Sequence, residues 1–274
     1  MLSFCKTLLH LVRRYLRLWL AFFRHSLTQE MQYRLNFVLV FVMDIVWYAV
    51  NIGFFEVIYM NTDNIAGYTR YEVFFFMTTI FVIDALDMML FSSSLWVMND
   101  LIRKGDFDLL LTKPIAPMFY ASTRDISIGS LLDSFFALGL LGYAWANLAP
   151  NATAIDVVAY LILLVCGLLT MYSLQMFFAS LGFIFVNAST SLQWGFHHLY
   201  QLAMKPEAIY KGLLRYILLY FVPMIAIGAL PASMIIRGFD WHNFLLGITV
   251  SIVMLFLTTK FFYYGLRRYE SASS

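Results

Sequence analysis

A chain of 274 residues that is 62% hydrophobic and only 12% charged cannot cover itself with polar surface, because soluble domains are roughly 45–50% apolar and about 25% charged. The composition excludes an ordinary soluble protein, and the length leaves room for one membrane domain but not for a full enzyme domain besides. The net charge of +2 says little until the charges are placed along the chain.

The first 35 residues interleave basic and apolar side chains at helical spacing. The apolar positions are Leu8, Val12, Tyr15, Trp19, Phe22 and Phe23, and His10, Arg13, Arg14, Arg17 and Arg24 occupy much of the remainder. A cleavable signal peptide has a basic region followed by an apolar one, so this pattern is not a signal. It predicts an amphipathic helix over residues 1–35 that lies in the inner membrane interface. A simple topology anchor and a gating role both remain open for it.

Six later segments are apolar enough to cross a bilayer, whose core of ~30 Å needs about 20 such residues per helix. The predicted spans are Asn36–Tyr59, Tyr71–Met98, Ile126–Leu148, Ile155–Val186, Leu213–Leu230 and Phe244–Tyr264. Their length and aliphatic character favour helices over the strands of a membrane barrel, which alternate over ~10 residues. We therefore expect an all-α polytopic domain over residues 36–265 and a short cytoplasmic tail over residues 266–274.

Lys and Arg fall mostly on one side of this six-span scheme. With the N-terminus in the cytoplasm, 16 of the 18 basic residues lie on the inner side, including Lys205, Lys211 and Arg215, and only Arg70 and Arg237 lie outside. Lys and Arg of short loops are retained in the cytoplasm. The asymmetry predicts an even number of spans and both termini in the cytoplasm.

A compact charged segment, residues 99–118, separates the second and third spans and contains the run "LIRKGDFDLLLTKPIAP". Arg103 and Lys104 suit the C-terminal end of a helix. Gly105 is the residue best able to take the left-handed conformation that ends one, and Asp106 is a good N-cap for the next. The residues therefore predict a helix, a sharp turn and a new helix start.

The new helix is expected to be short. It covers Phe107–Lys113, with Asp108 in its first turn, until Pro114 disfavours helical geometry at the residue before it. Pro117 stiffens the entry to the following element. Apolar side chains at Phe107, Leu110 and Leu111 predict a face that docks on a partner or rests on the bilayer interface, and the residues alone leave both open.

The stretch "RKGDFDLLLTKPIAP" resembles the signature of type-2 ATP-binding cassette (ABC) exporter permeases with one six-span permease per chain. In that family such a segment forms a coupling helix that fits a groove on a separate ATPase subunit. The resemblance implies a coupling role for Arg103, Lys104, Gly105, Asp106, Phe107, Asp108, Leu110, Leu111, Pro114 and Pro117. It also implies that Phe107, Leu110 and Leu111 form the docking face.

A second stretch, "YFVPMIAIGALPASMI", resembles the fifth span of the same family, with Pro223 and Pro231 toward its outer end. This resemblance implies a re-entrant segment or outer gate between the fifth and sixth spans. The implied function is ATP-driven export of a hydrophobic or amphipathic compound, such as a drug, a lipid-like molecule or a natural product, across the cytoplasmic (inner) membrane. The implied partners are two ATPase subunits that bind ATP and Mg²⁺, membrane lipid, and a second permease chain, the same or different.

The chain itself lacks the signatures of an enzyme. It has no G-x-x-x-x-G-K-[ST] phosphate loop, so we expect no bound cofactor and no catalytic residue. His197 and His198 have no further ligands at metal-binding spacing, and they are interpreted as interfacial residues of an inner segment. Nothing indicates a nucleic-acid partner.

Four acids, Asp44, Asp84, Asp87 and Asp133, fall inside predicted spans. A charge inside a bilayer is costly, so such residues face partners or a cavity. They could be bonded to polar groups at helix contacts, line a translocation path, or relay protons. The last reading gives the alternative of an ion- or proton-coupled secondary transporter, although the repeats and broken helices typical of that class are not visible. A non-transporting membrane scaffold or membrane enzyme is a further alternative.

Overall fold

The computed structural model describes residues 2–32, 34–148 and 151–269, and within these ranges it contains helices and no β-strand. Five helical stretches are long and apolar enough to cross a membrane: Val38–Tyr59, Arg70–Lys104, Gly129–Leu148, Ala154–Leu181 and Trp241–Arg268. A bent pair of helices makes a sixth if it is counted as one span. The prediction of an all-α polytopic membrane protein is confirmed.

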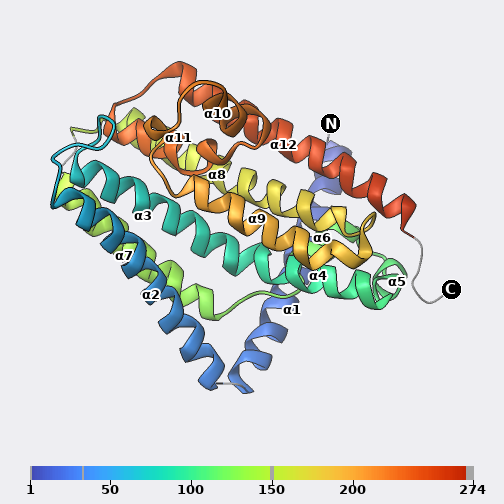
Figure 1. Cartoon of the computed structure of the whole chain (residues 1–274). Helices are drawn as coiled ribbons and strands as arrows, with labels where there is room; N and C mark the ends of the chain where they lie inside the picture. The colour runs from blue at the N-terminus through green and yellow to red at the C-terminus, as the bar shows by residue number, and fades with distance from the viewer. Residues whose placement is uncertain (1, 33, 149–150, 270–274) are drawn as a thin grey trace.

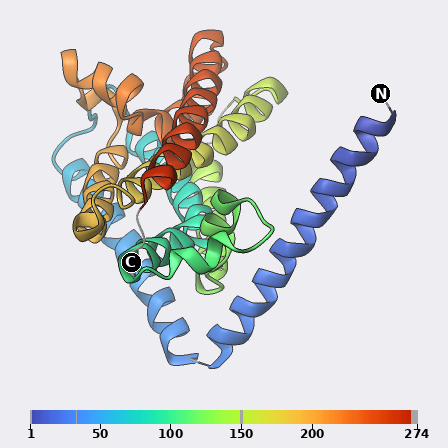
Figure 2. The same cartoon turned by 90° about the vertical axis from the view of Figure 1, so that its right-hand side faces the viewer.

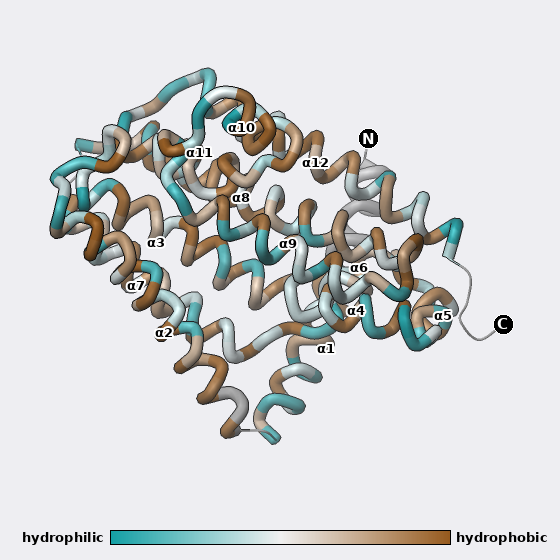
Figure 3. The backbone as a smooth tube through the Cα atoms, viewed as in Figure 1, coloured by the Kyte–Doolittle hydropathy of each residue, from teal (hydrophilic) through white to brown (hydrophobic). Residues whose placement is uncertain are grey.

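The described helices, in chain order, are α1 (Leu2–Gln32), α2 (Arg34–Tyr59), α3 (Arg70–Asp87), α4 (Ser93–Lys104), α5 (Phe107–Leu111), α6 (Pro117–Thr123), α7 (Gly129–Leu148), α8 (Ala154–Leu181), α9 (Ser189–Ala203), α10 (Gly212–Tyr216), α11 (Met224–Ile236) and α12 (Trp241–Arg268). A π-helical turn, Met88–Ser92, joins α3 and α4 into one continuous rod. In Figure 1, α8 lies against α11 and α12, and α3 packs against α7. Figure 3 shows hydrophobic residues along α2, α7 and α12.

The bundle has two ends, which we name after a residue at each. At the Tyr68 end, the Tyr59 hydroxyl donates a hydrogen bond to the Tyr68 carbonyl oxygen at 2.8 Å, and the Arg237 guanidinium lies 4.9 Å from the Tyr68 ring centroid. At the Phe107 end, the ring of Phe107 lies 5.1 Å from that of Phe183 and 5.9 Å from that of Tyr269. Residues 270–274 of the predicted cytoplasmic tail lie outside the described residues.

After α8 the chain returns to the Tyr68 end through α9, where the sequence predicted an inner loop. Gln193, early in α9, accepts a hydrogen bond from Asn99 near the end of α4. Beyond α9, the Glu207 carboxylate lies 3.6 Å from the Arg237 guanidinium at the Tyr68 end. α9 has only 15 residues and rises roughly 22 Å. It is therefore shorter than the run of about 20 apolar residues that predicts a membrane span.

The predicted fifth span, Leu213–Leu230, is wrong as a straight helix. The two helical segments Gly212–Phe221 and Met224–Ile236 meet at an angle of 91°. Pro223 stands at the break, where it has no backbone N–H to continue a helix. With α9 returning the chain, the bent pair takes the form of a re-entrant segment before α12, and Pro231 is buried within α11.

The assignment of Lys205, Lys211 and Arg215 to the inner side is also corrected. Arg215 lies 3.7 Å from Glu207 at the Tyr68 end, and the Lys205 ammonium lies 5.8 Å from the ring of Phe54, near the end of α2. Lys211 belongs to the same connection between α9 and α10. These three residues were misplaced because α9 was not recognised as a helix that crosses the bundle before them. With α9 included, 13 basic residues lie on the predicted inner side and five lie at the Tyr68 end.

Two glycines let α11 enter the bundle deeply. The Gly167 position of α8 lies directly against the backbone carbonyl of Ile227, and Gly228 lies against the side chain of Ile80 in α3. A side chain at either position would overlap these atoms. Absence of a Cβ therefore sets how closely α11 approaches α8 and α3, as in other tightly packed membrane helices.

α1 runs across the direction of the spans, as Figure 2 shows. Its aromatic residues contact α6: Tyr15 lies 4.7 Å from Phe119, and Phe22 lies 5.4 Å from Tyr120, between ring centroids. The Glu30 carboxylate accepts hydrogen bonds from two backbone N–H groups at the start of α7, those of Ile128 at 2.8 Å and Gly129 at 2.9 Å. The predicted interfacial helix thus also supports the beginning of a span.

We expect Glu30→Ala to lower the free energy of unfolding by about 1–2 kcal/mol, because it leaves N-terminal N–H groups of α7 without their acceptor and removes a negative charge from a helix N-terminus. Thermal unfolding of the detergent-solubilised chain measures the effect. The exposed neighbour Gln29 provides the control, and Gln29→Ala should leave the midpoint unchanged. Equal midpoints for the two variants would show that the contact carries no stability.

Candidate functional site

The turn that begins the segment between α4 and α5 follows the sequence prediction. Gly105 ends α4 with φ +78° and ψ 2°, the left-handed conformation. Asp106 precedes α5, but its side chain makes no capping hydrogen bond, and its carbonyl oxygen instead accepts from the N–H of Leu109 at 3.2 Å. The helix is set by the glycine turn and the backbone rather than by an Asp cap.

The exposed face of α5 differs from the expected one. Phe107 and Leu110 are 0% and 4% exposed, because they pack into a cluster formed by the ends of α4, α8 and α12. Leu109 and Leu111 are 68% and 40% exposed. The docking face predicted from Phe107, Leu110 and Leu111 is therefore corrected: only Leu111 of the three is accessible, and Leu109 joins it.

The polar residues of the segment are held by local contacts. Arg103 pairs with Asp100 of its own helix at 3.0 Å, while Lys104 is exposed. The Lys113 ammonium donates to the Tyr120 hydroxyl at 2.9 Å. Pro117 occupies the first turn of α6, the position that proline fits best in a helix.

The surroundings of α5 also tie it to α1 and to the end of α12. The carbonyl oxygen of Pro114 accepts a hydrogen bond from Arg14. Burial raises the pKa of the Tyr269 hydroxyl, and the nearby carboxylates of Asp108 and Asp106 raise it further. The segment is thus braced from two sides, and its outward face carries Leu109, Leu111 and charged groups.

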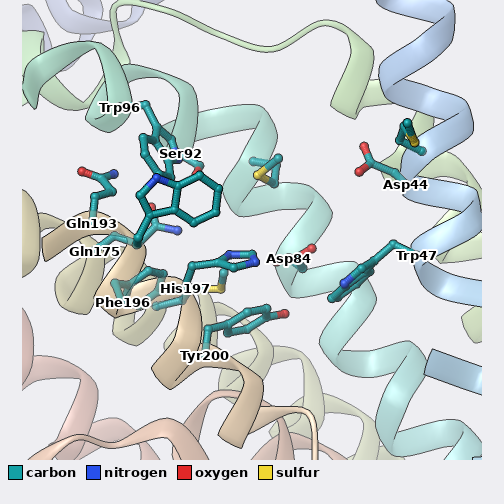
Figure 4. A pocket seen from close by; sticks show the side chains of 14 residues that line it. Asp44, Trp47, Asp84, Ser92, Trp96, Gln175, Gln193, Phe196, His197 and Tyr200 are labelled. Atoms are coloured by element: carbon teal, nitrogen blue, oxygen red, sulfur yellow. The ribbon is translucent and has the colours of Figure 1, made fainter. Parts of the chain in front are cut away.

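A cavity of about 390 Å³ lies midway along the bundle, between α2, the α3–α4 rod, α8 and α9 (Figure 4). Its lining residues are Met43, Asp44, Trp47, Asp84, Met88, Ser92, Trp96, Met171, Gln175, Gln193, Trp194, Phe196, His197 and Tyr200. Met88 and Ser92 belong to the π-helical turn, a feature that is frequent at functional sites.

The four intramembrane acids gather around this cavity to different degrees. Asp44 and Asp84 line it. Asp87 is fully buried behind it and accepts a hydrogen bond from the Gln175 amide at 2.7 Å. Asp133 of α7, 2% exposed, lies beside Asp44. The predicted path residues therefore form one cluster, with two members at the cavity wall and two supporting it.

Several cavity residues were not predicted. The wall formed by Trp96, Gln193 and Trp194 depends on α9 being a crossing helix, so no local pattern could reveal it. His197, predicted in an inner interfacial segment, instead lines the cavity from the middle of α9. Within the described ranges no group of three or more His, Cys, Asp or Glu side chains could hold a metal ion.

The outer-gate prolines lie in the re-entrant segment. Pro223 stands at the break between the two bent helices. Pro231 is buried inside α11, which leads to the Tyr68 end, where Arg237 contacts Glu207. Both prolines thus shape the entry of α11 into the bundle, and their role as a gate stays a prediction.

Long apolar helices, a re-entrant segment and a braced short helix between the second and third spans define a multi-pass membrane protein. Residues 45–273 match the family described as "ABC-2 family transporter protein", and the chain belongs to that family. It is therefore the membrane component of an ABC transporter rather than a catalytic subunit, and membership implies an ABC ATPase partner. No curated protein and no solved structure gives a match.

Proposed function

We propose that this permease is the transmembrane subunit of an ATP-driven exporter that moves a hydrophobic or amphipathic compound across the cytoplasmic membrane. The observation that carries the proposal is the form of α5. Phe107 and Leu110 anchor it in the bundle, while Leu109 and Leu111 project outward. A rigid helix with exposed leucines is suited to seat in a groove of a separate subunit.

In this proposal the Phe107 end faces the cytoplasm, and both termini lie on that side. The excess of Lys and Arg at that end, 13 against five, supports the orientation. Two ATPase subunits bind ATP and Mg²⁺ and dock on α5, and a second permease chain, the same or different, completes the translocation path. Membrane lipid surrounds the bundle.

The force of nucleotide-driven closure is transmitted from α5 to the cavity through one helix. Only Gly105 and Asp106 separate α5 from α4, and α4 continues through the π-helical turn into the cavity wall at Met88 and Ser92. Asp44 and Asp84 lie on the proposed path, with Asp87 and Asp133 behind them. Pro223 and Pro231 shape the re-entrant segment that closes the path toward the Tyr68 end.

A proton-coupled secondary transporter is the second candidate, and the adjacent carboxyl groups of Asp44 and Asp133 favour it, because two such groups readily share a proton. The two functions separate cleanly in vesicles. Export by the ABC complex should require ATP and persist after the proton gradient is collapsed. Transport that needs no ATPase but stops with the gradient would favour the second candidate.

The direct test of docking is a cysteine at Leu109 in a Cys5→Ser, Cys166→Ser background. We expect Leu109→Cys to crosslink to the ATPase in the assembled complex and to resist an impermeant maleimide added outside intact cells. Asp63→Cys, in the exposed loop between α2 and α3, is the control and should show the opposite behaviour on both counts. Labelling of Leu109→Cys from outside, or its failure to crosslink in an intact complex, would overturn the proposal.

A further inference from the structure

Among the described residues that line the cavity, Asp44 and Asp84 are the acids, and His197 is the one side chain that can become cationic. Asp44 enters from α2 and Asp84 from α3, and none of the described residues that line the cavity is Lys or Arg. Figure 4 shows the two carboxyl groups on the same side of the space. In a low-dielectric interior an unbalanced carboxylate costs several kcal/mol unless a positive group approaches it. An anionic ligand would meet repulsion here.

Aromatic side chains cover the facing walls. Trp96 of α4 and Trp194 of α9 meet at 5.3 Å between ring centroids, and Phe196 and Tyr200 of α9 extend this group. Trp47 lies on the other side, on the helix that carries Asp44. The negative faces of indole and phenol rings attract cations, most strongly where water is excluded. The space of about 390 Å³ falls within the ordinary range for small organic ligands of roughly 300–1,000 Å³.

One buried polar atom in the lining lacks a partner. The Gln175 carbonyl oxygen has no hydrogen-bond partner within the described part of the chain, and the residue is 5% exposed. The Tyr200 hydroxyl, by contrast, lies beside the Asp84 carboxyl. The Gln175 amide is already committed to Asp87, so its oxygen remains an unpaired acceptor in a residue of the cavity wall. Buried groups left in this state are normally completed by a donor.

A proton or a metal ion explains fewer of these features. Protonation of an acid would neutralise it but would leave the aromatic walls and the Gln175 oxygen without a role. Hard metal ions require about six oxygen ligands, whereas two carboxylates line the space. A ligand that carries both a positive charge and an apolar body satisfies the carboxylates, the rings and the free Gln175 oxygen together.

From this arrangement we infer that the cavity binds an amphipathic organic cation, a protonated amine or quaternary onium group with an apolar body. The positive group lies between Asp44 and Asp84, and the apolar body rests on Trp96, Trp194 and Tyr200. The inference names the substrate class of the proposed exporter and depends on that proposal only for the transport of the ligand, because binding itself needs no ATPase.

The test uses two ions of the same shape and opposite charge, tetraphenylphosphonium and tetraphenylborate. Binding of each is measured with the full chain in zwitterionic lipid nanodiscs, with empty nanodiscs subtracted. We expect saturable binding of the phosphonium and none of the borate. Asp84→Asn and Asp44→Asn should each weaken phosphonium binding roughly ten-fold or more, whereas the exposed-loop variant Asp63→Asn should bind as the wild type.

Equal binding of the two ions by the wild-type chain would overturn the inference, and this comparison requires no variant to fold. Phosphonium binding unchanged in both cavity variants would overturn it as well. A second arm replaces part of the lipid with phosphatidylethanolamine. Competition by this lipid would support the cation site and assign its occupant to a lipid amine, and absence of competition would support a free amphipathic cation.

These outcomes are independent of the proposed function. If the chain docks an ATPase through α5 but does not discriminate between the ions, only the cation inference fails. If it binds the phosphonium but Leu109→Cys does not crosslink to an ATPase in the intact complex, the exporter proposal fails and the inferred binding site is retained.

Discussion

Phe107→Ala is expected to lower the free energy of unfolding of the permease by about 3–5 kcal/mol, the usual cost of removing a fully buried phenyl ring. Phe107 is 0% exposed and makes edge contacts with the rings of Phe183 and Tyr269. Its loss opens a cavity where α5 meets the ends of α8 and α12. Denaturant titration of the solubilised chain gives the size of the effect.

Leu109 provides the matched comparison on the same short helix. Because it is 68% exposed, Leu109→Ala should change the unfolding free energy by less than about 0.5 kcal/mol while weakening co-purification of the ATPase. Phe107→Leu, which keeps an apolar anchor, should retain the ATPase. If Leu109→Ala destabilised the chain as much as Phe107→Ala, the division of α5 into a buried and an outward face would be refuted.

Gly167→Ala is the second substitution for which we expect a large effect. A methyl group at this position would overlap the backbone carbonyl of Ile227, and a backbone atom cannot rotate away as a side-chain terminus can. α8 and α11 would have to separate, at a cost of about 3 kcal/mol. A lower thermal midpoint, together with increased protease access to the re-entrant segment, is the expected result.

Gly139 of α7 separates this steric effect from helix propensity. A Cβ at Gly139 would meet nothing within 4 Å, so Gly139→Ala should leave the midpoint unchanged or raise it slightly, since alanine favours helix over glycine by roughly 0.5–1 kcal/mol. A Gly167→Ala variant as stable as Gly139→Ala would mean that α11 does not enter the bundle as described.

The sequence was most informative where a single residue decides a local conformation. Gly105 was predicted to end α4, and it does so in the left-handed region. The break at Pro223 was missed, because the apolar run continues through it and was taken as one span over Leu213–Leu230. Burial on α5 could not, because five residues form little more than one turn, and every face of so short a helix carries a leucine or phenylalanine. Long-range packing alone selects Phe107 and Leu110.

Only part of the candidate site could be predicted from the sequence, because some of its residues come from a helix that the apolar pattern does not reveal. Asp44, Asp84, Asp87 and Asp133 stand out as acids in apolar runs, and the structure gathers them. α9 did not stand out, because its 15 residues include Gln193 and two histidines and fall short of a bilayer-length apolar run. Because α9 was missed, Lys205, Lys211 and Arg215 were placed on the wrong side, and the five cavity residues that α9 contributes were not found.

The π-helical turn at Met88–Ser92 is a point at which the twist of the continuous α3–α4 helix can change. A π-helical turn contains one residue more than an α-helical turn. If the extra residue moves by one position along the helix, the following part of the helix rotates about its axis, while most backbone hydrogen bonds are kept. Rotation of this kind would change the positions of Trp96 and Ser92 relative to Asp84 without bending the α3–α4 helix. A change in twist at this turn would therefore connect the position of α5, which follows α4, to the shape of the cavity wall.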